Sequence, residues 1–350
     1  MTQKQASCKD FCVTIGLQME PKPISPITPA AAALARATQG LLRRFRSHRP
    51  LRGGSLLVTI FGDAIAPRGG IVTLGSLIRL AAPFGLTERL VRTSVGRLAQ
   101  EGWLVARRDG RRSEYRLSGY GEQSFAEATR RIYAASPSEW DGKWMLLLLP
   151  AKGPRREAGR RDELRQELRW LGFGQVSSGV FLHPGCTPER ARDWLRGLEE
   201  AKDAVLLQSF GDAGAADRRL VAAGWDLAEL GRRYRAFVAA FTPVRTAMHV
   251  PKSSKAVLMA SDGMPGREVA FVIRTLLIHE YRKIHLQDPS LPPQLLPAHW
   301  IGTSAYELCR SLYGSVFAAA EDYLSNTAST LSEALPAAGR EAYERFGGIG

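Results

Sequence analysis

The chain has few cysteines and lacks any long hydrophobic run. Its 350 residues contain four cysteines, at Cys8, Cys12, Cys186 and Cys309. Apart from a lone C-x3-C near the start, their spacing is not that of a metal site, so we expect reduced thiols. No segment approaches the roughly 20 apolar residues of a membrane helix, and the apolar patch 11–17 is too short for a signal peptide. The composition therefore predicts a soluble protein of the cytoplasm with no membrane partner.

The common catalytic motifs are also missing. No G-x-S-x-G elbow, G-x-x-x-x-G-K-[ST] loop or Rossmann fingerprint is present. The segment IHEYRKIH resembles the zinc motif HExxH, but Lys283 stands where the second histidine is needed. His279 and His285 are six residues apart and would point in different directions from one helix. We expect no catalytic residues, no metal and no cofactor. A structural role is expected for His279 and Glu280, with ligand binding as the alternative.

Acidic residues are scarce in one part of the chain. The formal net charge is +14, with 48 basic and 34 acidic residues. Residues 41–120 alone contain fifteen arginines and only five acids. An excess concentrated in one segment predicts a polyanionic partner for that segment.

Within this basic segment, residues 87–100 have the pattern of an amphipathic helix. Thr87 can cap its first turn, and Gly102 ends it. The apolar positions at helical spacing are Leu90, Val91, Val95, Leu98 and Ala99. The opposite face carries Arg89, Arg92, Thr93, Arg97 and Gln100. One face can pack in a core while the other reaches a ligand.

A basic hairpin follows this helix. An extended run begins at Trp103, and the dipeptide Asp109-Gly110 predicts the two-residue turn. The arginines around the turn are Arg107, Arg108, Arg111 and Arg112. Alone, such a hairpin could be a solvated surface feature. After an amphipathic basic helix it predicts a winged helix that binds a double-stranded DNA operator.

The middle of the chain has the order βαββαβ. A continuous apolar run at 143–149 predicts a central strand, and strands are also expected at 174–178, 179–183 and 204–210, with two helices between them. This is the ferredoxin-like arrangement, whose exposed sheet suits pairing with a second copy. Amphipathic helices are expected at 120–135, 225–241, 267–286 and 300–331. The sequence therefore predicts an α+β protein with a helical last third.

These parts together resemble the PaaX family of bacterial repressors, which control phenylacetic acid catabolism. The segments that carry the resemblance are TERLVRTSVGRLAQEGWL with its hairpin, DGKWMLLLLP, and RTLLIHEYRKIHLQDPSLPPQLLPAHW. The resemblance implies a winged helix, a central Cas2-like domain and a helical C-terminal domain. It also implies a homodimeric, non-enzymatic repressor of a catabolic operon, relieved by phenylacetyl-CoA or a related acyl-CoA.

The resemblance leads to five segments with expected roles. They are a mobile Pro/Ala-rich leader at 1–45, a winged-helix DNA-binding domain at 46–136, a ferredoxin-like dimerisation domain at 137–213, a helical effector and dimerisation domain at 214–335, and a tail at 336–350. Around residues 43–49 an arginine cluster could be a DNA-following arm or a solubilising linker.

An acyl-CoA needs cationic groups for its phosphates and an aromatic cavity for its acyl end. The residues that supply both in the last third are Arg274, Tyr281, Arg282, Lys283, Trp300 and Tyr306. Packing and surface roles are the alternative for each of them. If the pocket lies elsewhere, the domain junction is the expected place.

The Cas2-like domain raises one enzymatic alternative, a metal-dependent nuclease. Nucleases of that fold are expected to have an aspartate at the end of the first strand. Here that strand ends Leu148-Leu149-Pro150-Ala151, and Asp141 lies at its other end. A hard cation would find no anionic oxygen there. A third possibility is a protein that binds nucleic acid without sequence preference.

Overall fold

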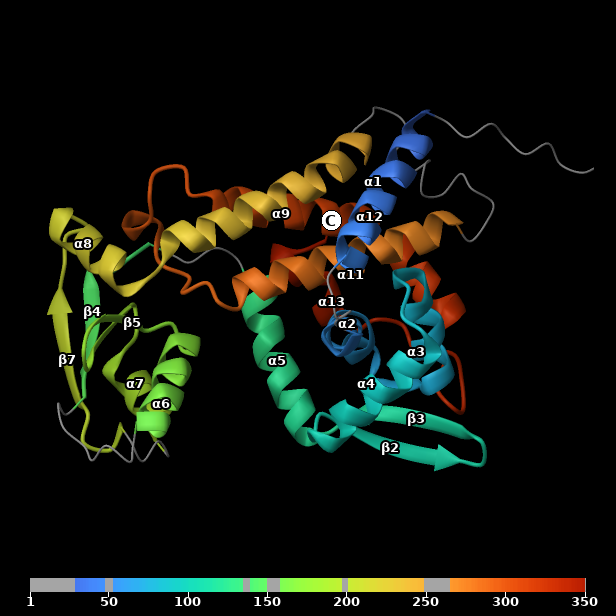
Figure 1. The fold of residues 1–350 in the computed structure, drawn as a ribbon, viewed down its shortest axis with the longest axis horizontal. Coiled ribbons are helices and arrows are strands. Elements are labelled where there is room, and N and C mark those ends of the chain that lie inside the picture. The colour runs from blue at the N-terminus through green and yellow to red at the C-terminus, as the bar shows by residue number, and fades with distance from the viewer. Residues whose placement is uncertain are drawn as a thin grey trace, which may run out of the picture.

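The computed structural model describes residues 29–47, 53–134, 139–149, 158–196, 201–248 and 265–349. Figure 1 shows a small body around a four-stranded sheet at one end and a larger, mainly helical body with a β-hairpin at the other. The predicted α+β class with three parts is confirmed. No helix in these ranges is long and apolar enough to cross a bilayer.

The N-terminal part is a winged helix with a three-stranded sheet. Its elements are α2 (Gly53–Ile60), the π-helical turn η1 (Phe61–Ile65), β1 (Ile71–Thr73), α3 (Leu74–Ala81), α4 (Glu88–Gln100), β2 (Leu104–Asp109) and β3 (Arg112–Leu117). The strands are antiparallel in the order β1-β3-β2. β1 has only three residues, which is too short for a recognisable strand pattern in the sequence.

A helix precedes the winged helix where the sequence predicted part of a leader. α1 (Pro29–Ser47) buries Leu34, Leu41, Leu42 and Phe45, and it packs against α9 and α11. The expectation of a mobile leader is therefore wrong for residues 29–45. The apolar face of this helix was not recognised in the alanine-rich sequence, because it is stabilised only by packing against helices far along the chain. Residues 1–28 of the predicted leader lie outside the described ranges.

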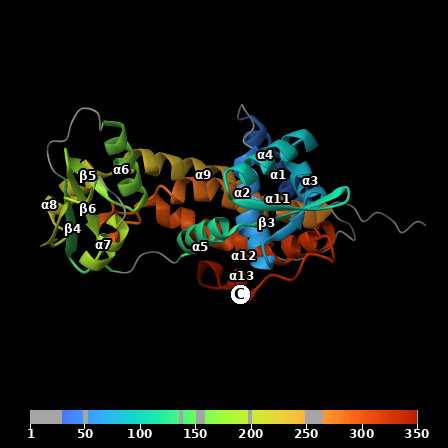
Figure 2. The ribbon, with the colours of Figure 1, turned by 90° about the horizontal axis from the view of Figure 1, so that it is seen from below.

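The central domain has the predicted order of strands and helices. Its elements are β4 (Lys143–Leu148), α6 (Ala158–Trp170), β5 (Gly174–Ser177), β6 (Val180–Pro184), α7 (Pro188–Leu195) and β7 (Val205–Phe210), and α8 (Ala215–Gly224) follows. The strands lie in the order β5-β6-β4-β7, and every neighbouring pair is antiparallel. This is the sheet of the ferredoxin-like fold. α6 and α7 lie on the same side of it (Figure 2).

Long helices form the rest of the larger body. They are α5 (Gly119–Tyr133), α9 (Leu227–Met248), α11 (Pro265–His285) and α12 (Ile301–Thr327), followed by the short α13 (Arg340–Tyr343). The predicted tail, 336–350, is anchored to the body near its end, because Arg345 and Phe346 are both buried. The boundaries predicted at residues 45 and 335 thus do not coincide with breaks in packing.

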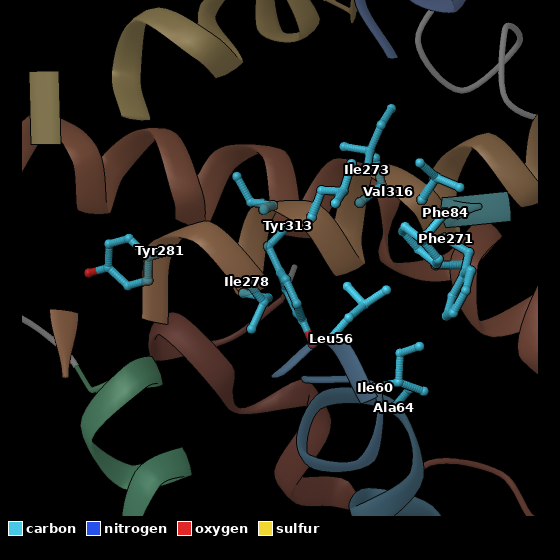
Figure 3. Close-up of a cluster of buried hydrophobic side chains, with 14 of the residues drawn as sticks. Leu56, Ile60, Ala64, Phe84, Phe271, Ile273, Ile278, Tyr281, Tyr313 and Val316 are labelled. Carbon is cyan, nitrogen blue, oxygen red and sulfur yellow. The ribbon is translucent and has the colours of Figure 1, made fainter. Parts of the chain in front are cut away.

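The winged helix and the C-terminal helices share one hydrophobic core. Buried side chains of α2, including Leu56 and Ile60, belong to the same cluster as Ile278 of α11 and Tyr313 of α12 (Figure 3). The central domain has a separate core between its sheet and α6 and α7. Two of the three predicted domains are therefore one structural body.

Candidate nucleic-acid interface and interdomain cleft

α4 presents the basic face that its sequence predicts. Thr87 caps the helix by accepting a hydrogen bond from the Leu90 N–H at 3.3 Å. Val91, Val95 and Leu98 are buried. The residues predicted to face outward, Arg89, Arg92, Thr93 and Arg97, are all exposed. Two of these arginines are held in i,i+4 ion pairs, Arg92 with Glu88 and Arg97 with Glu101.

The hairpin is a wing with a basic tip. Asp109 pairs with Arg112, so the turn residues are Gly110 and Arg111 and not the predicted Asp109-Gly110. Gly110 has a φ of 54°, and glycine at the first turn position is typical of a type II′ turn. The arginines Arg107, Arg108, Arg111 and Arg112 are exposed, as expected. α4 and the wing lie at the same end of the larger body (Figure 1).

The wing sheet is fastened to the segment that follows α12. The buried Glu114 of β3 accepts a hydrogen bond from the Leu331 N–H at 2.8 Å. The Thr73 N–H of β1 donates to the Ser329 carbonyl at 3.0 Å. The basic surface is therefore rigidly attached to the C-terminal helices.

A buried ionic cluster around Asp63 joins the same two parts. Asp63 lies in the π-helical turn. Its carboxylate forms ion pairs with Arg274 of α11 at 2.7 Å and with Arg345 near the end of the chain at 2.9 Å. Tyr133 and Tyr313 also donate to its carboxylate. Burial alone raises the pKa of Asp63, but the two guanidinium groups lower it below its ordinary value. The carboxylate is therefore charged in the interior.

The arginines predicted for the effector site lie elsewhere in the body. Arg274 is 1% exposed and bonded to Asp63 and Glu321, so it does not reach solvent. Arg282 donates to Thr59 and to Ser55 of α2, and burial lowers the pKa of Arg282 to about 10. Arg282 thus holds α2 against α11, and Arg274 joins α11 to η1 and α12. Lys283 pairs with Glu280 within α11.

The three aromatic residues of the same prediction do meet in one place. Tyr281, Trp300 and Tyr306 line a cleft of about 1080 Å³ between the central domain, α5 and the C-terminal helices. Its cationic lining comes from residues that the sequence did not single out, Arg130, Arg131 and Arg190. Trp170 and Trp194 add indole rings from the central domain. The cleft thus combines cations with aromatic surface.

Arg131 connects all three parts at the wall of this cleft. Its guanidinium donates to the Trp170 carbonyl at 3.0 Å and to the Leu286 carbonyl at 3.1 Å. It also lies 4.6 Å from the centroid of the Trp170 ring. The Arg131 carbonyl interacts with His285 of α11 at 3.1 Å. One residue of α5 therefore contacts both the central domain and the end of α11.

The central domain brings histidine and arginine to the opposite wall. His183 contacts the rings of Phe173 and Trp194, and burial lowers its pKa to about 4. The imidazole is therefore neutral at neutral pH. Arg190 lies 4.7 Å from the centroid of the Trp194 ring. This wall therefore carries a cation beside the tilted rings of His183 and Trp194.

The remaining candidates for chemistry are placed as structural groups. His279 is buried, and its Nδ1 lies 3.0 Å from the Thr59 hydroxyl. β4 ends in leucines, and Asp141 at its other end pairs with Lys143. Among the described residues, no group of three or more His, Cys, Asp or Glu side chains could hold a metal ion. The nuclease alternative gains no support from this part of the chain.

The sequence missed the cleft cations because no local pattern marks them. Arg130 and Arg131 end a helix, and Arg190 lies on a short helix with an ordinary surface pattern. Only the approach of the three parts brings them together. Asp63 was missed for the same reason, since its partners Arg274 and Arg345 are 211 and 282 residues away.

A winged helix with a basic face on one helix and a basic wing is typical of DNA-binding proteins, including transcription regulators. Family models match three segments: PaaX-like protein at residues 52–121, the PaaX protein central Cas2-like domain at 137–221, and the PaaX-like protein C-terminal domain at 225–326. The transcriptional repressor PaaX of Escherichia coli (strain K12) is 37% identical over 303 residues, 86% of this chain and 92% of that protein. The chain belongs to the PaaX family of transcriptional repressors, which are regulators and not enzymes.

Among solved structures, one similar chain is the uncharacterized protein Rv0674 from Mycobacterium tuberculosis. It is 21% identical, with a TM-score of 0.44, and the match covers 83% of this chain and 98% of that one.

Proposed function

We propose that this chain is a homodimeric repressor of the cytoplasm that binds operator DNA through α4 and the wing. The observation that carries the proposal is the exposure of all eight predicted DNA-binding side chains on α4 and its adjoining hairpin. α4 enters the major groove with Arg92, Thr93 and Arg97 facing base edges. The wing arginines contact phosphates.

Arginine variants on α4 and on the wing test this division of roles. Arg92→Ala or Arg97→Ala should cost about 1–3 kcal/mol on a duplex selected for tight binding and less on random duplex. Arg108→Ala or Arg111→Ala should weaken both duplexes alike and flatten the salt dependence. Fluorescence anisotropy over a salt series measures both effects. Equal losses on both duplexes for the α4 variants would instead indicate binding without sequence preference.

We further propose that the interdomain cleft is the effector site, with an aryl-acetyl-CoA thioester such as phenylacetyl-CoA as its ligand. The cleft supplies Arg130 and Arg190 for phosphates and Trp194, Trp300 and Tyr306 for the planar groups. In this proposal Arg130 and Arg190 take the phosphate-binding role that the sequence assigned to Arg274 and Arg282, whose guanidinium groups are bonded inside the protein. A ligand here contacts the central domain and the DNA-binding body together.

The effector then acts by changing the angle between the two bodies of each protomer. In a dimer, that angle sets the spacing of the two α4 helices and therefore the fit to two half-sites. The control of an aromatic-acid catabolic operon is the corresponding biological role, in keeping with the PaaX relative.

Calorimetric titration with phenylacetyl-CoA, and with free CoA as the comparison, tests the site. Arg190→Met and Trp300→Leu should each weaken binding of the thioester at least several-fold. Arg192→Met, an exposed arginine on the same short helix that does not line the cleft, is the matched control. DNA and thioester should weaken each other by the same factor, because coupling is reciprocal. Unchanged thioester binding in both cleft variants would place the site elsewhere.

A further inference from the structure

Three of the four sheet edges in the described ranges are protected against pairing with another strand. β2 carries exposed Arg107 and Arg108 along the wing. β1 is bonded to the segment after α12 through Thr73 and Ser329. β5 has an irregular register between Gln175 and Ser177, and α8 packs against it. Charges, covering segments and bulges are the usual means of blocking an open edge.

The fourth edge, β7, carries no charge and no bulge within the described ranges, although α7 packs against the strand. It pairs with β4 without a bulge, from Val205 opposite Leu148 to Phe210 opposite Lys143. Its sequence VLLQSF contains no charge and no proline. Val205, Leu207 and Phe210 are 51%, 48% and 74% exposed, and they are three of the seven large hydrophobic side chains exposed in the described ranges. A regular, apolar and uncharged edge is a template for strand addition.

We infer that β7 pairs antiparallel with β7 of a second copy of this chain, which joins two four-stranded sheets into one of eight strands. The inference rests on the homodimer of the proposed function and assigns its interface. A two-fold axis near Leu207 makes the contact isologous, so each strand supplies both halves of it. Val205 and Leu207, two residues apart, then share one face of the joined sheet with their partner's counterparts.

The uncharged β7 strand is compatible with a second copy of this chain as its occupant, which the homodimer of the proposed function requires. Two chains of net charge +14 repel wherever their basic surfaces meet. β7 is a strip where identical chains meet without placing like charges opposite each other. Figure 1 places β7 at the outer edge of the small body, at the end of the molecule opposite the wing. Pairing there leaves both DNA-binding surfaces free.

A charge placed in the middle of the strand tests the interface. Leu207→Lys puts like charges opposite each other across the two-fold axis, so light scattering should find the 38.4 kDa mass of one chain where the parent protein has twice that mass. Ser177→Lys, which adds the same charge at an exposed position on the opposite edge, should stay dimeric. Circular dichroism and the melting temperature check that both variants are folded.

Mixing two variants of opposite charge makes the test specific for strand pairing. Leu207→Lys and Leu207→Glu should each be monomeric alone and should form a dimer when mixed, because the positions face each other. A parent dimer that persists in Leu207→Lys, or a mixture that stays monomeric, would overturn the β7 interface and leave the homodimer itself standing. A monomeric parent protein, bound to operator as one chain, would overturn the homodimer of the proposed function.

Discussion

The two junctions of this molecule are built in opposite ways. The winged helix meets the C-terminal helices through a continuous hydrophobic core and the buried Asp63 cluster. The central domain keeps its own core and meets the same body across an open cleft. At the cleft wall the bonds come mainly from Arg131, and a small apolar cluster around Trp144, Leu291 and Leu295 lies behind the sheet.

This difference identifies the parts that can move relative to each other. A buried ionic cluster with this many ion pairs and hydrogen bonds favours one arrangement, since each unpaired charge inside a protein is costly. A junction of few polar contacts beside a cleft permits more than one arrangement. We therefore expect the DNA-binding surface to stay fixed to the C-terminal helices in any rearrangement, and the central domain to be the part that changes its angle.

The largest effect is expected at the fused junction. Asp63→Asn preserves the shape of the side chain but removes the charge that Arg274 and Arg345 share. Arg274 keeps its ion pair with Glu321, but Arg345 loses its ion pair, and leaving a buried charge without a partner costs about 3–5 kcal/mol. Denaturant unfolding should show a loss of that size. A variant as stable as the parent would mean that the cluster does not hold the winged helix to the C-terminal helices.

A pH dependence of stability is expected from His183 in the central domain. Its folded pKa is about 4, against the usual 6.5, so the unfolded chain binds a proton that the folded chain does not between these values. Stability should fall as the pH drops from about 6.5 toward 4, by at most about 2 kcal/mol at pH 5. His183→Asn should remove that slope, as measured by thermal unfolding at pH 7 and pH 5. An unchanged slope would assign it to other groups.

A smaller effect on stability is expected at the open junction. Arg131→Met removes hydrogen bonds to the Trp170 and Leu286 carbonyls, and partly exposed bonds of this kind contribute about 1 kcal/mol in total. The response of DNA affinity to the effector should be reduced while affinity without effector is nearly unchanged. Arg169→Met, an exposed neighbour of Trp170, is the control. A normal response in Arg131→Met would show that this contact does not couple the bodies.

The smallest effect is expected on the exposed face of α4. Glu88→Gln breaks the ion pair with Arg92, in which both side chains are more than half exposed. Such i,i+4 pairs contribute about 0.3–0.5 kcal/mol. DNA affinity should rise slightly, because a carboxylate near the phosphates is removed and Arg92 is released. A measurable loss of affinity would mean that Glu88 positions Arg92 for binding.

The sequence predicted best the features that depend on local patterns. α4 with its Thr87 cap and the βαββαβ order follow from spacing and turn residues, and the structure has both. The packing of α1 and the Asp63 cluster were not predicted. Neither the apolar face of one helix nor a single carboxylate indicates which distant residues it will contact. Of the residues predicted for an effector site, the three aromatic ones line the cleft and the two arginines do not, since the cleft exists only where three parts of the chain converge.

The Asp63 cluster also sets the order in which the protein can be completed during synthesis. Asp63 leaves the ribosome early, but its partner Arg345 is made 282 residues later. At bacterial translation rates of about 5–20 residues per second, that interval is on the order of 15–60 s. The contacts of Asp63 are therefore complete only after the last residues have been made. A nascent or truncated chain without Arg345 leaves Asp63 without one of its two ion pairs. The ionic cluster that joins the winged helix to the C-terminal helices is thus completed only when the end of the chain has been made.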